Sequence, residues 1–185
     1  MARSNPRLGQ MHCRFYNYEG LEISAQGSTD YVRGLTWDFV QQLKGHTSMK
    51  VLIKEIVTAE DARLAVENGI DGVIVSNHPG RAENSLRSTI ESLPEVVDAV
   101  QGRMVVLVDG GFRRGVDFFK ALAVVADGVC IGRPYLCGLA SFGQAGVEAV
   151  LDLLKRELES VMRQTGTTSI RQIQRSHVVE RSEPR

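Results

Sequence analysis

The sequence predicts an α/β fold in which about four successive βα units form half of a (β/α)8 TIM barrel, followed by a long C-terminal helix. Two observations carry this prediction. Short runs of β-branched and other apolar residues alternate with helical stretches, at spacings that suit right-handed crossovers. Each run also ends in polar residues, at the position where α/β sheets place their chemistry. A whole barrel needs about 250 residues, so these four units supply roughly half of one.

An open, doubly wound sheet is the structural alternative, because it is built from the same βα units. Its phosphate-binding fingerprint is Gly-x-Gly-x-x-Gly directly after the first strand. The sequence contains no such motif. The barrel is therefore the preferred interpretation.

Capping residues and glycines set the ends of the first two helices. Thr36 can cap a short helix that ends near Gly45, and Thr58 can cap a second that stops at Asn68-Gly69. Threonine accepts backbone N–H bonds at helix starts, and glycine takes the left-handed conformation found after helix ends. Residues 1–35 show no sustained period, so we expect an irregular segment there.

A proline divides the third helix in this prediction. Ser88 can cap its start, but Pro94 would remove a hydrogen bond from the helix interior, so a break and a restart over 94–100 are expected. The domain limits that follow are 1–35 for the irregular segment, 36–179 for the half-barrel and 180–185 for a tail. The other expected elements are strands at 50–56, 72–75, 104–108 and 128–131, helices at 37–44, 59–68, 116–123 and 144–165, and a last turn at 169–175.

Composition narrows the class of protein. The chain has 185 residues, with 22 basic and 22 acidic side chains. This balance indicates no basic surface for nucleic acid, no apolar run approaches the roughly 18 residues that cross a bilayer, and the N-terminus lacks the apolar core of a secretory signal. The cysteines, Cys13, Cys130 and Cys137, lack metal-ligand spacing, and the chain does not end in a Ser-Lys-Leu signal. We expect a reduced, cytoplasmic protein that binds neither nucleic acid, membrane nor metal.

Two glycine-containing turns with an arginine follow the last two strands. The first is Asp109-Gly110-Gly111-Phe112-Arg113 and the second is Gly132-Arg133. Glycine permits close backbone approach to a phosphate, arginine supplies a planar donor fork, and barrels commonly bind phosphate in the loops after their last two strands. Either turn alone is equally well explained as a plain tight turn. Together, at neighbouring strand ends, they favour a phosphate-bearing cofactor.

Three charged or titratable side chains lie at the ends of the earlier strands. Lys54 follows an apolar run and is either a solvated charge or a functional cation, since an inward-facing charge is normally paired or used. His78 is either a hydrogen-bonding turn residue or a base. Arg81 lies three positions further on and can bind a carboxylate, so the pair suits an acidic substrate.

Five motifs occur in the order and at the spacing of one known family. They are Val51-Leu52-Ile53-Lys54, Ser76-Asn77-His78-Pro79-Gly80-Arg81, Asp109-Gly110-Gly111-Phe112-Arg113-Arg114-Gly115, Lys120-Ala121-Leu122-Ala123 and Ile131-Gly132-Arg133-Pro134. Through them, residues 36 to 179 resemble the C-terminal half of the FMN-dependent α-hydroxy-acid oxidase and dehydrogenase family, which includes glycolate oxidase, L-lactate dehydrogenase and mandelate dehydrogenase.

The resemblance implies an FMN cofactor and the oxidation of small 2-hydroxy acids to 2-oxo acids. His78 falls on the family's active-site base and Arg81 on an arginine that holds the substrate carboxylate. Lys54 matches the cation near flavin N1 and O2, and Ser76 matches a flavin contact. The segments that match the FMN phosphate site are Asp109, Gly110, Gly111, Phe112 and Arg113, with Gly132 and Arg133.

The chain departs from the family pattern in two ways. Family members usually have glycine at the positions of Glu55 and Pro79. The strands that precede the matched half in the family have no counterpart in this chain. Half a barrel exposes strand edges and apolar side chains, so we expect a homo-oligomer or a complementing half-barrel; a shortened product that folds poorly is the third possibility.

Two classes of function therefore remain. One is the FMN-dependent oxidoreductase, and the other is a non-catalytic half-barrel, either a flavin-binding remnant or an assembly subunit. A different FMN barrel, such as a type 2 isopentenyl diphosphate isomerase, shares glycine-rich phosphate loops but accounts less well for the Ser-Asn-His-x-Gly-Arg block over 76–81.

Overall fold

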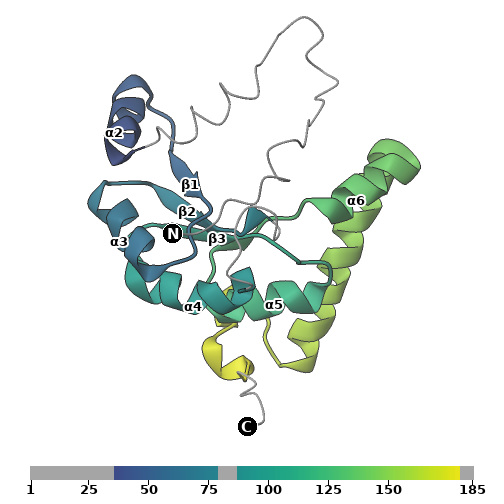
Figure 1. The fold of residues 1–185 in the computed structure, drawn as a ribbon. Coiled ribbons are helices and arrows are strands. Elements are labelled where there is room, and N and C mark those ends of the chain that lie inside the picture. The colour runs from purple at the N-terminus through teal and green to yellow at the C-terminus, as the bar shows by residue number, and fades with distance from the viewer. Residues whose placement is uncertain (1–35, 79–86, 180–185) are drawn as a thin grey trace, which may run out of the picture. The chain divides into compact units, whose positions relative to one another are not determined.

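A computed structural model of the chain describes residues 36–78 and 87–179 and contains one parallel sheet in the order β1-β2-β3-β4 (Figure 1). The α/β prediction of four strand–helix units is confirmed. The predicted segments 1–35 and 180–185 lie outside the described residues. The elements are α2 Trp37–His46, β1 Leu52–Lys54, α3 Ala59–Glu67, β2 Gly72–Val75, α4 Thr89–Val100, β3 Val105–Val108, α5 Gly115–Ala123, β4 Gly128–Val129, α6 Arg133–Gln164 and the 3-10 turns η3 Ile170–Gln172 and η4 Arg175–His177.

The chain divides into two compact units, Met1–Thr47 and Ser48–Arg185. Helix α2 belongs to the first unit. Its start is the predicted one, because the Thr36 hydroxyl accepts a hydrogen bond from the Phe39 amide at 3.4 Å. The sheet and all the other described helices belong to the second unit, which carries the predicted site.

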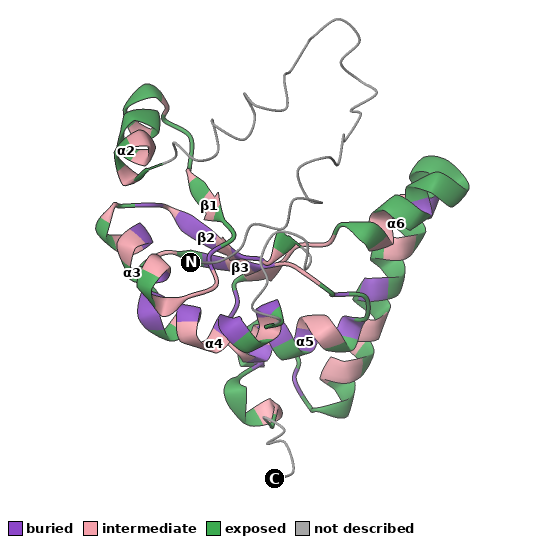
Figure 2. Cartoon of the chain, in the orientation of Figure 1, coloured by how far each residue is buried: buried purple, intermediate pink, exposed green. Residues whose placement is uncertain are grey.

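Helices cover one face of the sheet over its two central strands. Val73 and Val75 of β2 lie in register with Val106 and Val108 of β3, and all four are at most 3% exposed. Helix α4 packs against both strands, α3 against β2 and α5 against β4. Figure 2 shows this buried layer in β2, β3 and the helices beside them. Burial of these valines explains why uninterrupted apolar runs were a reliable strand signal.

The opposite face of the sheet is only partly covered within the described residues. Leu52, Gly72 and Val105 form one row across β1, β2 and β3, and the two larger side chains are 38% and 43% exposed. Strand β3 is one residue shorter than predicted, and two other strands are shortened more, since β1 covers three residues and β4 two. Both are the outer strands of the described sheet, where each has a single hydrogen-bonded neighbour.

Helix starts follow the predicted caps, whereas the break at Pro94 is wrong. The Thr58 hydroxyl accepts from the Asp61 amide at 3.2 Å, and Ser88 and Glu91 form a capping box. Helix α4 then continues through Pro94 to Val100. A proline removes one internal hydrogen bond, and this helix buries one side against the sheet, so packing outweighs that loss.

Helix α6 is longer than the predicted 144–165 because a first helical segment precedes a kink. Phe142 and Gly143 are non-helical, and Gly143 has φ 60°. The segments on either side meet backbone to backbone, since a Cβ on Gly138 would lie 2.5 Å from the Gly146 carbonyl oxygen. Among the described helices, α6 alone is long and apolar enough to cross a membrane, by length and composition only. This helix corrects the expectation that no apolar run approaches the roughly 18 residues that cross a bilayer. Its uncharged stretch covers residues 134–147.

The C-terminal turns seal the outer side of α5. Ile173 packs with Phe119 and Ala123 of α5 in a small buried cluster, which Leu158 and Met162 of α6 extend. The predicted last turn at 169–175 is therefore present, divided into η3 and η4. This packing fixes α5 and α6, whose N-termini carry the two predicted phosphate turns.

Candidate active site

Three strand ends bring a lysine, a serine and an aspartate together. The Lys54 Nζ atom donates to the Ser76 Oγ atom at 2.8 Å and lies 3.3 Å from the Asp109 Oδ2 atom. Ser76 is 1% exposed, whereas the Lys54 side chain is 41% exposed. Carboxyl ends of parallel strands meet at one edge of a sheet, which explains how residues 22 and more positions apart in the sequence converge.

His78 lies beside this cluster, directly after β2. Its amide donates to the Ser76 Oγ atom at 3.2 Å, and its Nδ1 atom contacts the Glu55 Oε1 atom. The His78 side chain is 50% exposed. The predicted partner Arg81 lies outside the described residues, so the structure places the predicted base and does not describe the predicted carboxylate clamp.

Asp109 presents an unused acceptor at the same place. Its Oδ1 atom is buried and has no hydrogen-bond partner among the described residues, while its Oδ2 atom faces Lys54. Nearby, burial and then the Asp109 charge raise the pKa of the Cys130 thiol, with Lys54 acting in the opposite sense. A buried oxygen without a partner is costly, so this atom suits a ligand that donates a hydrogen bond.

The glycine turn after β3 adopts a backbone that other residues rarely take. Gly110 and Gly111 have φ 93° and 88°, and a Cβ on Gly110 would lie 3.0 Å from the Thr89 Oγ1 atom. The Thr89 hydroxyl holds the turn by donating to the carbonyl oxygen of Asp109. This geometry explains the two successive glycines, since it leaves the backbone open to a ligand.

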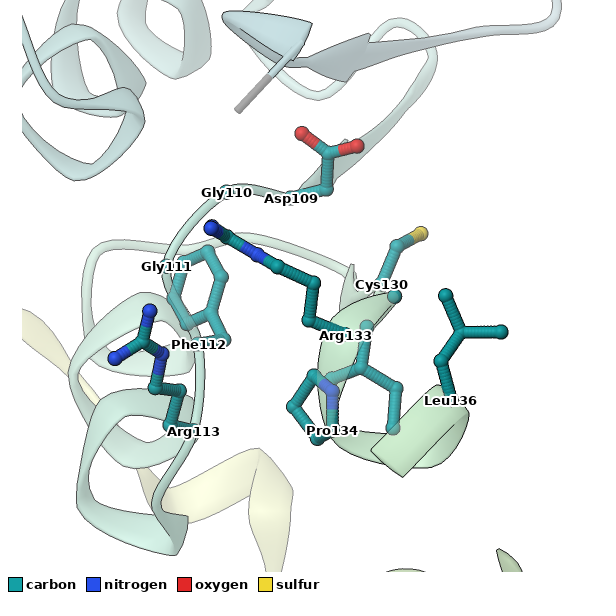
Figure 3. Close-up of a pocket in the computed structure, with 11 residues that line it drawn as sticks. Asp109, Gly110, Gly111, Phe112, Arg113, Cys130, Arg133, Pro134 and Leu136 are labelled. Atoms are coloured by element: carbon teal, nitrogen blue, oxygen red, sulfur yellow. The ribbon is translucent and has the colours of Figure 1, made fainter. Parts of the chain in front are cut away.

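Both predicted phosphate turns line one pocket of about 220 Å³ (Figure 3). The Arg133 side chain extends from the start of α6 toward the Gly110–Gly111 turn, and Arg113, in the turn before α5, also lines the pocket. A helix N-terminus attracts anions, and guanidinium groups bind phosphate oxygens in pairs. The lining residues are Asp109, Gly110, Gly111, Phe112, Arg113, Cys130, Ile131, Gly132, Arg133, Pro134 and Leu136.

Sequence reasoning missed three members of the site. The sequence marks Glu55 only as a departure from the family's usual glycine and gives no sign of its contact with His78. Thr89 was expected only within a helix start, and Cys130 only within a strand. The pairing of β3 with β4 shows why Cys130 belongs to the site. Val108 pairs with Val129, so Asp109 and Cys130 follow at the same level of neighbouring strands.

Comparison with known proteins identifies the family of the chain. The model of the FMN-dependent dehydrogenase family matches residues 10–180. The chain belongs to the FMN-dependent dehydrogenase family. It is 47% identical over 174 residues to glycolate oxidase 5 of Oryza sativa subsp. japonica, and 46% identical over 173 residues to glycolate oxidase of Spinacia oleracea. The predictions of the family and of FMN as its cofactor are confirmed.

Solved structures of mandelate oxidase show the same fold. One, with a monooxide FMN adduct, superposes with a TM-score of 0.73 at 43% identity and covers 76% of this chain and 45% of the other. Another, with benzoyl-formic acid, has the same TM-score and covers 42% of the other chain. The two glycolate oxidases are each covered over 47% of their length. The chain therefore spans about half the length of these relatives and forms part of a (β/α)8 barrel.

Proposed function

We propose that this chain supplies the C-terminal half of an FMN-dependent oxidoreductase that oxidises small 2-hydroxy acids to 2-oxo acids. The observation that carries the proposal is the group formed by Lys54, Ser76 and Asp109 beside the arginine-lined pocket. A cation, a candidate base and a phosphate-sized pocket at one sheet edge are the parts that this chemistry requires.

The described residues fit FMN at three points. The pocket offers Arg113 and Arg133 to the phosphate, together with a glycine turn that admits close backbone approach. The unpartnered Oδ1 atom of Asp109 can accept a hydrogen bond from a hydroxyl group of the ribityl chain. Lys54, held toward the sheet edge by Ser76 and Asp109, would stabilise negative charge on the reduced ring.

The proposed roles of the remaining residues concern the substrate. Bound FMN would accept the two electrons that leave the 2-hydroxy acid. His78 takes up the substrate proton, since an imidazole titrates close to neutral pH. Arg81, outside the described residues, binds the substrate carboxylate through its planar donor fork.

A flavin titration tests the proposal. The purified chain is mixed with FMN, the visible spectrum is recorded, and glycolate, lactate or mandelate is added without oxygen. We expect the flavin absorbance to bleach with wild type and to persist with His78→Ala, which keeps the phosphate pocket and serves as the matched control. Absence of FMN binding at tens of micromolar would refute the flavin site itself.

A second candidate function is favoured by the face of the sheet that the described residues cover only in part. Leu52 and Val105 expose 38% and 43% of their surface on the side that faces the interior of a barrel. We propose that a second half-barrel, from another copy or another chain, covers this face; without one, the chain acts as a non-catalytic flavin-binding or assembly subunit.

The two functions are separated by adding the missing half. The chain is co-expressed with the N-terminal half of a glycolate oxidase relative, and complex formation is measured by analytical ultracentrifugation. Flavin bleaching that is faster in the complex than in the chain alone supports the half-enzyme. Flavin binding without bleaching, in the complex and alone, supports the non-catalytic subunit.

A further inference from the structure

Glu55 directly follows β1, and its carboxylate lies between two groups of the candidate site. The Oε1 atom contacts the Nδ1 atom of His78 and lies 4.0 Å from the Nζ atom of Lys54. Both side chains of the Glu55–His78 pair are about half exposed, at 43% and 50%. The contact involves only the Nδ1 atom of His78 and not the second ring nitrogen, Nε2.

The backbone on both sides of this contact is unusual. Glu55 has φ 74° and His78 has φ 52°, a region that residues other than glycine rarely adopt. The Ile74 carbonyl oxygen accepts from the amides of Glu55 at 3.1 Å and Ile56 at 3.4 Å, which holds this bend at the end of β1. Glutamate therefore occupies a conformation that glycine would adopt without strain. Such outliers persist where surrounding contacts fix them, and they concentrate at functional sites.

We propose that Glu55 is a positioning residue that fixes the tautomer of His78. The carboxylate accepts the Nδ1–H group of the neutral imidazole, so the lone pair of Nε2 is left to take a proton. This rests on the proposed role of His78 as the base. When Nε2 takes the substrate proton, the imidazolium keeps its Nδ1–H on Glu55, and no other bond to either residue forms or breaks.

Glu55 can act on His78 in two ways, because its hydrogen bond orients the ring and its charge balances an imidazolium. A glutamine can accept the Nδ1–H group but carries no charge to balance an imidazolium. A glycine can do neither, although it adopts φ 74° without strain and is therefore expected to fold. Glu55→Gln and Glu55→Gly consequently separate the orientation of the ring from the compensation of its charge.

Nitrogen NMR reads the tautomer directly. The ¹⁵N-labelled chain is studied through a pH series, and long-range ¹H–¹⁵N correlations of the neutral ring identify the protonated ring nitrogen; His78→Gln assigns the signal. We expect His78 as the Nδ1–H form in wild type and Glu55→Gln, and mainly as the Nε2–H form of free histidine in Glu55→Gly. His46, whose Nδ1 atom lies 2.7 Å from the Gln42 carbonyl oxygen, is the internal control and keeps its form throughout. A wild-type His78 in the Nε2–H form, or one unchanged in Glu55→Gly, overturns the proposal.

Flavin reduction by the complemented barrel supplies an independent readout. We expect Glu55→Gly to slow anaerobic bleaching by at least tenfold without a comparable change in FMN affinity, and Glu55→Gln to lie between it and wild type. Equal bleaching rates in wild type and Glu55→Gly would overturn the positioning role. If wild type itself binds FMN but does not bleach, the proposed function fails, while the NMR result still decides whether Glu55 sets the tautomer.

Discussion

Replacing Gly115 with alanine tests how tightly α5 is held against α6. A Cβ at this position would lie 2.2 Å from the amide nitrogen of Leu158 and 2.5 Å from the carbonyl carbon of Glu157. Both are backbone atoms of a helix and cannot turn aside as a side-chain tip can. Because favourable contacts between carbon atoms lie at about 3.5–4.0 Å, the two helices would have to separate by roughly 1 Å.

The magnitude follows from the atoms that this separation disturbs. Inserting one methyl group into a packed interface costs about 1–3 kcal/mol. Two backbone atoms are affected here, and the Glu157 carboxylate would also lose its contact with the Gly115 amide, which is 2.8 Å long. We therefore expect a loss near the upper end, about 3 kcal/mol.

Urea denaturation followed by far-ultraviolet circular dichroism measures this loss. With a slope of about 2 kcal/mol per molar urea, the midpoint of Gly115→Ala falls by roughly 1.5 M. Gly45→Ala is the matched control, because nothing lies within 4 Å of a Cβ at that position in α2, and its midpoint does not fall. A Gly115→Ala chain within about 0.5 kcal/mol of wild type, the range of ordinary surface changes, would refute this account of the α5–α6 contact.

Three further substitutions test other parts of the fold. Val125 has φ 73° and is 55% exposed, so Val125→Gly relieves left-handed strain for a net gain of roughly 1 kcal/mol in the free energy of unfolding; Val125→Ala gains less, and a loss in the glycine variant contradicts the reasoning. The hydrogen bond from Arg114 holds the pKa of Glu157 below its usual range. The stabilisation that the Glu157 carboxylate contributes is therefore full above the unfolded pKa of about 4.3 and is lost as the pH falls through the folded pKa. The difference in free energy of unfolding between wild type and Glu157→Gln, measured by urea titration, should shrink from pH 6 to pH 3. A difference that stays constant over this range would exclude the role of the Glu157 charge. Thr89→Val removes the donor that holds the Gly110 turn and costs about 1–3 kcal/mol, which thermal denaturation compares with Thr89→Ser, the variant that keeps the hydroxyl.

Local chemistry predicted those parts of the fold that depend on a few neighbouring residues. The start of α3 follows from Thr58, whose hydroxyl accepts the Asp61 amide, and the start of α4 follows from Ser88, whose amide and hydroxyl donate to the Glu91 carboxylate. The continuity of α4 through Pro94 and the kink of α6 could not be predicted in the same way. Both depend on packing between segments distant in the sequence, such as the approach of Gly138 to Gly146 across the kink.

The same distinction applies to the site. Lys54, Ser76 and Asp109 could be grouped from the sequence, because each ends a parallel strand and such ends share one edge of a sheet. The contact between Glu55 and His78 could not, since it requires positive φ at two residues whose local preference is against it. Sequence patterns therefore locate the regular frame of the site, while its strained connections have to be seen in the structure.

The two faces of the sheet differ in exposure, and this difference bears on the rate of the proposed reaction. The central strands of the helix-covered face are sealed, with Val73 and Val108 fully buried, whereas Val105 on the other face remains 43% exposed. The side chains proposed for chemistry share that incomplete environment, since Lys54 is 41% and His78 50% exposed. Electrostatic stabilisation of a reacting group is strongest where water is excluded. Covering the open face should therefore raise the rate of flavin reduction more than the affinity for FMN, whose phosphate pocket is already formed between α5 and α6. If cover by a second half-barrel changes only the affinity, exposure of these side chains is not what limits the chemistry.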